Sequence, residues 1–461
     1  MAQDDIHRLK QARHHGRVVS DLRQATPVIL EADHHQHGKD GNEDDGGGNT
    51  APQAWLILSL DAASEAEWQD TQAMLPDGCE PALLLSAERA ALLATGGYGV
   101  DHGGMAAMPT VPEPPDDDSA PAAMTDAPGS DVVGSSAAGS DVTGPLTTGT
   151  DTPSNHPQSM GIMLPMATLA NPCEAQALSA LVTTLRQVAG LGVDATHRAQ
   201  GTGLFGLRSP LVLDRAIRLL KNSFLIPAAL VWPLDDDGLR HAQAAGLLRI
   251  TSNAIDEHRQ APLLLSPTVT ADVPFETAVR AKFHVFRAPA DGREHVAIEV
   301  TGDQEAPADS VPLVRLHAAC LTGDLFGSLR CDCGDQLRGA LDLMAKQEGG
   351  VLLYLAQEGR DIGLVNKMRA YRLQDAGLDT IDANLALGFA ADERDYTIAA
   401  TMLRELGHPV IRLLTNNPDK IAQLEAAGIV VSQRVAHHFP PNPHNQAYIA
   451  TKQKRAGHLV E

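Results

Sequence analysis

Residues 90–185 contain no lysine and no arginine, and this stretch constrains the fold of the chain more than any other feature. Within it, residues 113–158 consist largely of Pro, Asp, Gly, Ser, Thr and Ala, and a ten-residue pattern recurs from Gly129 and Gly139 before it fades after Gly149. Such a segment buries too little apolar surface to offset its chain entropy. We therefore expect separate folded parts around a disordered insert.

The length of 461 residues predicts two or three structural units. Hydrophobic residues make up 43% of the chain and aromatic residues only 3%, so its cores must be built from Leu, Ala, Val and Ile. We expect a mixed α/β (α+β) architecture. An interrupted N-terminal α/β domain would occupy residues 1–100 and 161–270, the disordered insert residues 101–160, and a C-terminal catalytic domain residues 271–461. A second flexible insert is expected over 34–50.

The formal net charge of −22 argues against nucleic-acid binding and against anionic membrane surfaces as partners. It does not exclude an anionic small substrate, because a local cluster of Arg and Lys overrides a global deficit. The N-terminal residues 1–23 are polar and lack the apolar core of a signal peptide. No apolar stretch is long enough to span a bilayer, so a cytoplasmic protein is expected.

Hydrophobic periodicity gives a coarse set of expected elements. In the N-terminal half these are a helix followed by a strand within 17–32, a strand at 54–60, a strand followed by a helix within 83–93, helices at 173–189 and 211–220, and a strand at 228–232. In the C-terminal half strands are expected at 295–300, 311–316, 351–355, 410–415 and 430–435, and helices at 336–346, 363–376, 394–406 and 418–427.

Three of the five cysteines cluster as Cys320, Cys331 and Cys333, while Cys79 and Cys173 stand apart. An odd number with this clustering is a poor disulfide framework and favours a thiolate metal site in a reducing cytosol. Three protein ligands are typical of a catalytic zinc with one open coordination position. The alternatives are buried free thiols or an incomplete structural site, and an iron–sulfur cluster would require a fourth cysteine.

Cationic residues surround this pattern in sequence and indicate an anion site. They are Arg315, His317, Arg330, Arg360, Lys367, Arg369 and Arg394. A glycine-rich turn spans 358–363, and 415–420 leaves a strand and begins a helix, which suits either a phosphate cradle or an ordinary helix cap. Asp392 and Arg394 are either an acid/base and an arginine of the active site, or Asp392 is an acid placed in the first turn of a helix by the helix dipole. Spacing alone leaves both readings open.

Five stretches, in this order, together resemble GTP cyclohydrolase II, the first committed enzyme of riboflavin biosynthesis. The stretches are 320–334, 357–364, 366–371 with 374–375, 388–395, and 413–418. The resemblance covers residues 273–458. It implies one Zn²⁺ per chain on Cys320, Cys331 and Cys333, and a zinc-activated water that attacks C8 of the guanine of GTP.

The resemblance also implies roles for other residues. Arg394 would be the nucleophile on the α-phosphorus, Asp392 the proton acceptor, and Tyr371 a residue that orients or protonates during ring opening. Formate and pyrophosphate would leave 2,5-diamino-6-(5-phosphoribosylamino)pyrimidin-4-one, Mg²⁺ would accompany the triphosphate, and the enzyme would be a homodimer. The implied nucleotide-binding residues are Arg315, Leu316, His317, Gln336, Glu358, Gly359, Arg360, Thr380, Thr415 and Lys420.

Two departures from the family open alternatives. Ala318 and Ala319 stand where the family usually places polar residues, so a catalytically weakened, nucleotide-binding regulatory paralogue is the second hypothesis. Residues 21–30 resemble the start of 3,4-dihydroxy-2-butanone 4-phosphate synthase, but the acidic metal motif of that enzyme is absent, which implies a degenerate synthase-like N-terminal half. A bifunctional enzyme and a zinc-based nucleic-acid binder are the remaining hypotheses, and the missing motif and the acidic charge disfavour them.

Overall fold

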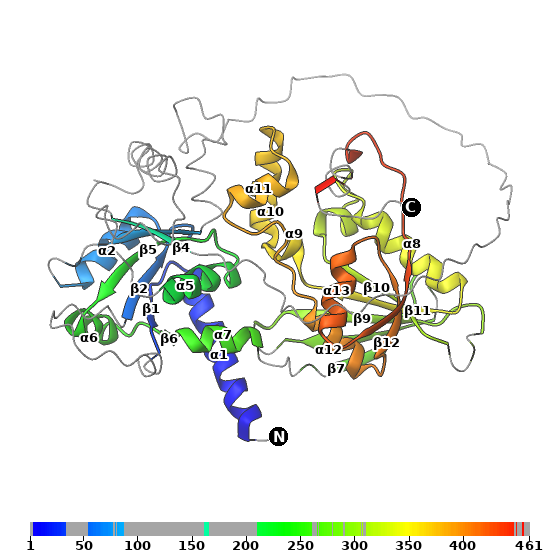
Figure 1. Ribbon diagram of the computed structural model, residues 1–461, viewed down its shortest axis with the longest axis horizontal. Coiled ribbons are helices and arrows are strands. Elements are labelled where there is room, and N and C mark those ends of the chain that lie inside the picture. Colours follow the sequence, from blue (N-terminus) through cyan, green and yellow to red (C-terminus); the bar gives the residue numbers. More distant parts are fainter. Residues whose placement is uncertain are drawn as a thin grey trace, which may run out of the picture. The chain divides into compact units, whose positions relative to one another are not determined.

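The computed structural model contains two β-sheets, each with its own helices and hydrophobic cores (Figure 1). It describes residues 3–33, 54–76, 79, 81–86, 161–165, 210–260, 265, 267–278, 280–288, 291–305, 307, 310–446, 449, 454 and 455. The predicted inserts over 34–50 and 101–160 and the predicted helix over 173–189 lie outside these residues. None of the helices in the described ranges is long and apolar enough to cross a membrane.

The N-terminal sheet has the strand order β4-β3-β5-β2-β1-β6. Neighbouring strands are antiparallel except β1 and β6, which run parallel. Its strands are β1 (Val28–Glu31), β2 (Ala54–Ser59), β3 (Ala82–Ser86), β4 (Gly161–Pro165), β5 (Ala228–Leu234) and β6 (Arg249–Thr251).

Helices cover both faces of this sheet, because alternate residues of each strand point to opposite sides. One core joins Ile57 to α1 (Gln3–Arg23), α5 (Pro210–Asn222) and α7 (Ser252–Gln260). The other joins Leu56 to buried or half-buried residues of the segments that carry α2 (Glu65–Met74) and α6 (Asp236–Ala244). The result is a three-layer unit of the α/β class that the sequence predicts for this half.

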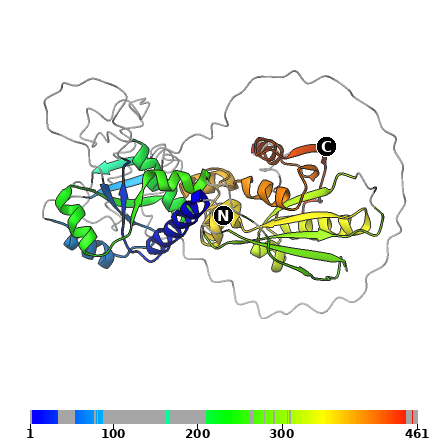
Figure 2. The same ribbon diagram turned by 90° about the horizontal axis from the view of Figure 1, so that it is seen from below.

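The C-terminal sheet is mixed and has the order β13-β12-β10-β11-β9-β8-β7. Figure 2 shows the same ribbon turned by 90° about the horizontal axis. Strands β13, β12, β10 and β11 are parallel, and the remainder pair antiparallel. The strands are β7 (Pro267–Asp272), β8 (Ala281–Arg287), β9 (Glu294–Val300), β10 (Leu313–Ala318), β11 (Gly350–Leu355), β12 (Val410–Leu414) and β13 (Val430–Val435).

Strand β11 illustrates how this sheet is buried on both sides. Val351, Leu353 and Leu355 share a core with residues of α12 and α13, whereas Leu352 faces the core that includes α8. The helical segments of this half are the π-helical turn η4 (Leu321–Leu325), α8 (Cys333–Lys346), α9 (Glu358–Asp361), α10 (Gly363–Asp375), α11 (Thr380–Ala386), α12 (Thr397–Glu405) and α13 (Pro418–Ala426).

Some element boundaries differ from the sequence predictions. Helix α12 begins at Thr397 rather than at 394, so Asp392 and Arg394 lie in the preceding loop, and the reading of Asp392 as a first-turn acid is wrong. Helix α1 begins at Gln3 and not near residue 17. The sequence misses this start because the first part of the helix is polar and shows little hydrophobic periodicity. The hairpin of β7 and β8 has no counterpart among the predicted strands.

Candidate active site

The candidate site lies where three parallel strands end. Strand β10 leads into Ala319 and Cys320, β11 into Gln357 and Glu358, and β12 into Thr415. Residues from all three strand ends line one pocket. Ligand sites of open α/β sheets occur at the carboxyl ends of parallel strands, because the connecting loops gather there.

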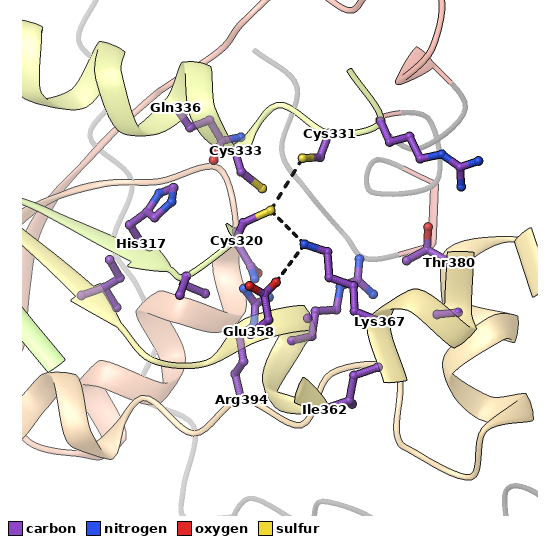
Figure 3. Close-up of a pocket in the computed structure, with 18 of the residues that line it drawn as sticks. His317, Cys320, Cys331, Cys333, Gln336, Glu358, Ile362, Lys367, Thr380 and Arg394 are labelled. Atoms are coloured by element: carbon purple, nitrogen blue, oxygen red, sulfur yellow. Dashed lines mark hydrogen bonds and ion pairs between the residues drawn. The ribbon is translucent and has the colours of Figure 1, made fainter. Parts of the chain in front are cut away.

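The sulfur atoms of Cys320, Cys331 and Cys333 point toward one another at this pocket (Figure 3). All three Sγ atoms lie within 4.8 Å of each other, and Cys320 and Cys331 Sγ are 3.8 Å apart. Two thiolates on a tetrahedral zinc with bonds of about 2.3 Å stand roughly 3.8 Å apart. The donor set therefore fits a zinc ion.

Gly323 makes the close approach of the three cysteines possible. A Cβ atom at this position would lie 2.8 Å from Cys331 Sγ and 3.1 Å from Cys320 Sγ. Both contacts are shorter than van der Waals separation, so any side chain here would displace the sulfurs. The glycine belongs to turn η4, which follows Cys320 directly.

Lys367 of α10 supplies the positive charge nearest to the sulfurs. Its Nζ donates hydrogen bonds to Cys320 Sγ at 3.1 Å, to Thr322 Oγ1 at 2.9 Å and to Glu358 Oε1 at 2.8 Å. The other oxygen of Glu358 accepts the Leu321 backbone N–H at 2.7 Å. This network connects the end of β11 to the cysteine loop, which we define as residues 320–333.

In the protein without metal, hydrogen bonds from Cys331 and Cys333 lower the pKa of Cys320, and Lys367 adds to the effect. The hydrogen bond to Cys320 raises the pKa of Cys331, and the same interaction raises that of Cys333. One thiolate is thus stabilised by two neighbouring thiols. Thiolate character is what metal binding requires of a cysteine.

Asp324 orients the end of β10 and the start of the cysteine loop. Its carboxylate accepts hydrogen bonds from His317 Nε2 at 3.0 Å, from Tyr354 Oη at 2.9 Å and from the Cys320 backbone N–H at 2.9 Å. Burial lowers the pKa of His317 in spite of Asp324. A neutral His317 that donates from Nε2 satisfies this geometry.

Six cationic side chains line the same pocket, whereas Glu358 is the single acidic residue among the described lining residues. The six are Arg315, Arg330, Arg360, Lys367, Arg394 and Lys420. Arg315 is buried and donates to Leu414 O at 2.8 Å, and burial lowers its pKa to about 10. Lys420 Nζ donates to Leu316 O at 2.8 Å. A pocket with this charge suits an anionic ligand.

The backbone after Glu358 is strained. Gly359, Arg360 and Asp361 all have positive φ, of 66°, 63° and 68°. Each non-glycine residue in this region costs about 1–3 kcal/mol, and such residues gather at functional sites. The turn directs Arg360 to the pocket, where its Nη1 also donates to Ala391 O at 3.0 Å.

Asp392 and Arg394 form a bidentate ion pair in the loop before α12. Arg394 Nε donates to Asp392 Oδ1 at 2.8 Å, and Nη2 donates to Oδ2 at 2.5 Å. Arg394 lines the pocket and Asp392 does not. Although desolvation opposes it, Arg394 lowers the pKa of Asp392.

Tyr371 lies beside Arg330, whose guanidinium carbon is 5.0 Å from the centre of the tyrosine ring. Burial raises the pKa of Tyr371 to about 12.

Apart from Asp392 and Arg369, the structure brings all the site residues named from the sequence to one pocket. Arg369 instead pairs with Asp61 at 2.8 Å. Thr415 and Lys420 line the pocket, but Asn417 already caps helix α13 by accepting the Asp419 N–H at 2.9 Å. Ala318 and Ala319 also line it.

Sequence reasoning gave no role to Asp324 or His437, and none to Lys367 beyond its charge. His437 lines the pocket after β13, is buried, and leaves Nδ1 without a hydrogen-bond partner among the described residues. Asp324 stands four residues after Cys320, within the cysteine stretch, which is the one signal that could have drawn attention to it.

Comparison with known proteins identifies the family. The model of the GTP cyclohydrolase II family matches residues 267–436. A GTP cyclohydrolase-2 of Azospirillum brasilense is 49% identical over 276 residues, which cover 58% of this chain and 71% of that protein. A GTP cyclohydrolase-2 of Pseudomonas putida is 50% identical over 200 residues, which cover 43% of this chain and 94% of that protein.

The Azospirillum match extends beyond the C-terminal half, because residues 267–461 alone are too few to make up 58% of the chain. A solved two-domain 3,4-dihydroxy-2-butanone 4-phosphate synthase from A. baumannii is 14% identical and covers 92% of this chain and 99% of its own. Its TM-score of 0.24 is too low to show a shared fold.

Proposed function

This chain belongs to the GTP cyclohydrolase II family, and on that premise we propose that it hydrolyses GTP. The products would be 2,5-diamino-6-(5-phosphoribosylamino)pyrimidin-4-one, formate and pyrophosphate, as in the first step of riboflavin biosynthesis. The observation that carries the proposal is the meeting of three thiols and six cationic side chains at one pocket. Formate release from GTP by the zinc-loaded protein tests it.

Cys320, Cys331 and Cys333 would hold one Zn²⁺, and a bound zinc supplies an activated water of pKa near 7. Lys367 would offset the negative charge of the thiolates, since its ammonium already contacts Cys320. The described cysteines are all free, which suits the reducing cytoplasm that we propose for this protein.

Arg315, Arg360, Arg394 and Lys420 would bind the triphosphate, together with an accompanying Mg²⁺. Arg394 would attack the α-phosphorus and displace pyrophosphate, and a water molecule would then hydrolyse the nitrogen–phosphorus bond to free the nucleotide. The pairing of Arg394 with Asp392 supports this role, because the carboxylate fixes the guanidinium and lies ready to accept a proton. Tyr371, with its raised pKa, would remain protonated and so could orient or protonate the opening ring. Contacts to the nucleotide would also come from Leu316, His317, Gln336, Glu358, Gly359, Thr380 and Thr415.

A weakened, regulatory nucleotide-binding protein is the second candidate. Ala318 and Ala319 line the pocket and bring no polar group to it. Turnover of GTP at a rate ordinary for an enzyme would reject this candidate, whereas GTP binding without formate release would favour it over the first.

We also propose a homodimer. Three large apolar side chains between Cys320 and Cys331 are exposed, namely Leu325 at 70%, Phe326 at 73% and Leu329 at 58%. Exposed apolar groups in one segment favour a protein interface. Sedimentation equilibrium of the wild type and of Phe326→Glu tests this, with a dimer expected for the first and a monomer for the second. A monomeric wild type would reject the proposal.

For the N-terminal half we propose a degenerate relative of the butanone phosphate synthase that lacks its activity. The support is the absence of the acidic motif after residues 21–30. Incubation with ribulose 5-phosphate should yield no butanone phosphate, and formation of that product would instead establish a bifunctional enzyme.

A further inference from the structure

A second cavity, of about 510 Å³, lies along helix α1 and shares no lining residue with the cysteine pocket. Residues of α1 line one side, and Asp291, Arg293, Asp361 and Glu393 line another. Cavities of roughly 300–1,000 Å³ are the size that small-molecule ligands occupy in proteins. Nothing in the proposed chemistry uses this cavity.

The cavity is positively charged although the chain carries a net charge of −22. Five Arg and Lys side chains line it against three carboxylates. The carboxylates are already engaged. Arg293 pairs with Asp291 and, at 2.7 Å, with Asp361, and Lys221 pairs with Glu393 at 2.8 Å.

Arg13, Arg17 and Arg23 are the remaining cationic side chains of the lining. In the described part of the chain no ion pair joins any of them to a carboxylate. They recur at helical spacing with Gly16 and Ser20, so α1 turns one face to the cavity. Burial lowers the pKa of Arg23, whose Nε donates to Ser223 O at 2.8 Å.

An aromatic wall completes the cavity. The guanidinium groups of Arg23 and Arg293 lie 5.3 Å and 5.4 Å from the centre of the Phe224 ring. Phe224 has a φ of +55°, which is costly for a bulky residue and indicates that its position matters. Phe389, which also lies at this cavity, is fully buried in a neighbouring hydrophobic core.

We propose that this cavity binds a phosphorylated small metabolite. Arg13, Arg17 and Arg23 would contact the phosphate, because guanidinium groups form bidentate hydrogen bonds with phosphate oxygens. Phe224 would pack against the organic part of the ligand, which favours a phosphate ester over free phosphate.

Isothermal titration calorimetry on the full-length protein tests the proposal with three probes: ribose 5-phosphate, AMP and inorganic phosphate. Saturable binding of at least one phosphate ester is expected, with tighter binding than free phosphate. Arg13→Glu and Arg17→Glu should each weaken it about tenfold or more. Both side chains are exposed, so these variants should keep the wild-type circular dichroism spectrum.

Lys10→Glu is the matched control, because it makes the same charge change on an exposed position of the same helix and does not line the cavity. It should bind the probes as the wild type does. The active-site pocket is identical in all these proteins, so a difference between them reports on the second cavity alone. Failure of all three probes to bind, equal affinity in wild type and Arg17→Glu, or equal weakening by Lys10→Glu would each overturn the proposal.

Discussion

The ammonium of Lys367 lies 3.1 Å from the sulfur of Cys320, 47 residues away along the chain. This contact places a fixed positive charge beside a cluster of three thiols. Lys367→Met should therefore lower zinc affinity by about 10–100-fold, the usual effect of removing a partner of a metal ligand. Competition with a chromophoric chelator measures it.

Lys346→Met is the control for this change, since Lys346 is 71% exposed and its ion pair among the described residues is with Asp342 on its own helix. It should retain wild-type zinc affinity. Unaltered affinity in Lys367→Met would show that the lysine does not stabilise the thiolates.

Gly323→Ala should abolish most zinc binding. Its methyl group would meet the sulfurs of Cys331 and Cys320 at 2.8 and 3.1 Å, so the thiols must move apart. Gly327→Ala is a control from the same loop, because a Cβ there has nothing within 4 Å, although its positive φ costs about 1 kcal/mol. Zinc content by atomic absorption should fall only for Gly323→Ala. Full zinc occupancy in that variant would refute the close packing of this loop.

Arg394→Lys keeps the charge but removes the bidentate hydrogen bonds with Asp392. We expect kcat for GTP to fall at least about 100-fold with zinc content unchanged, because a precisely held guanidinium cannot be replaced by an ammonium. Arg404→Lys, a change at an exposed arginine of α12, should leave kcat unaltered. A kcat for Arg394→Lys within a factor of two or so of wild type would exclude a catalytic role.

Burial lowers the pKa of His295 to about 4. Its unfolded value is near 6.5, so the stability that neutral His295 provides is present above pH 6.5 and is lost as the pH falls toward 4. Between pH 7 and pH 5 the resulting loss in the free energy of unfolding amounts to about 2 kcal/mol.

The variant His295→Gln should lack this loss. Urea denaturation followed by circular dichroism at both pH values measures it, and His241→Gln, a change at an exposed histidine, should behave as the wild type. Burial raises the pKa of Asp361 to about 6, so protonation of Asp361 stabilises the folded protein as the pH falls. Because this effect opposes that of His295, the test is the difference in pH dependence between wild type and variant. Identical pH dependence in wild type and His295→Gln would contradict the assignment.

Local patterns carried much of the sequence prediction. Cys331 and Cys333 are two residues apart and Cys320 is only eleven before them, so their clustering was readable from spacing. The buried strand β11 was readable as a continuous apolar run. Lys367 and His437 reach the pocket from α10 and from the segment after β13, and no local pattern records such long-range contacts.

The misplaced elements have similar causes. Strand β8 carries Lys282, His284 and Arg287 and breaks regular alternation at Phe286–Arg287, and only pairing with β7 and β9 gives it a buried side. The second cavity could not be foreseen either. Its arginines share a face of α1, but Asp361 and Glu393, which complete it, are hundreds of residues away.

The most direct test of the proposed function is formate release from GTP by the zinc-loaded wild type and by Cys331→Ser, with zinc content measured on both. The wild type should bind about one zinc per chain and release one formate for each pyrimidine product. Cys331→Ser should lose both zinc and turnover, while circular dichroism stays unchanged. A wild type that holds its zinc and releases no formate from GTP, or a Cys331→Ser variant that turns over GTP at the wild-type rate, would contradict the account.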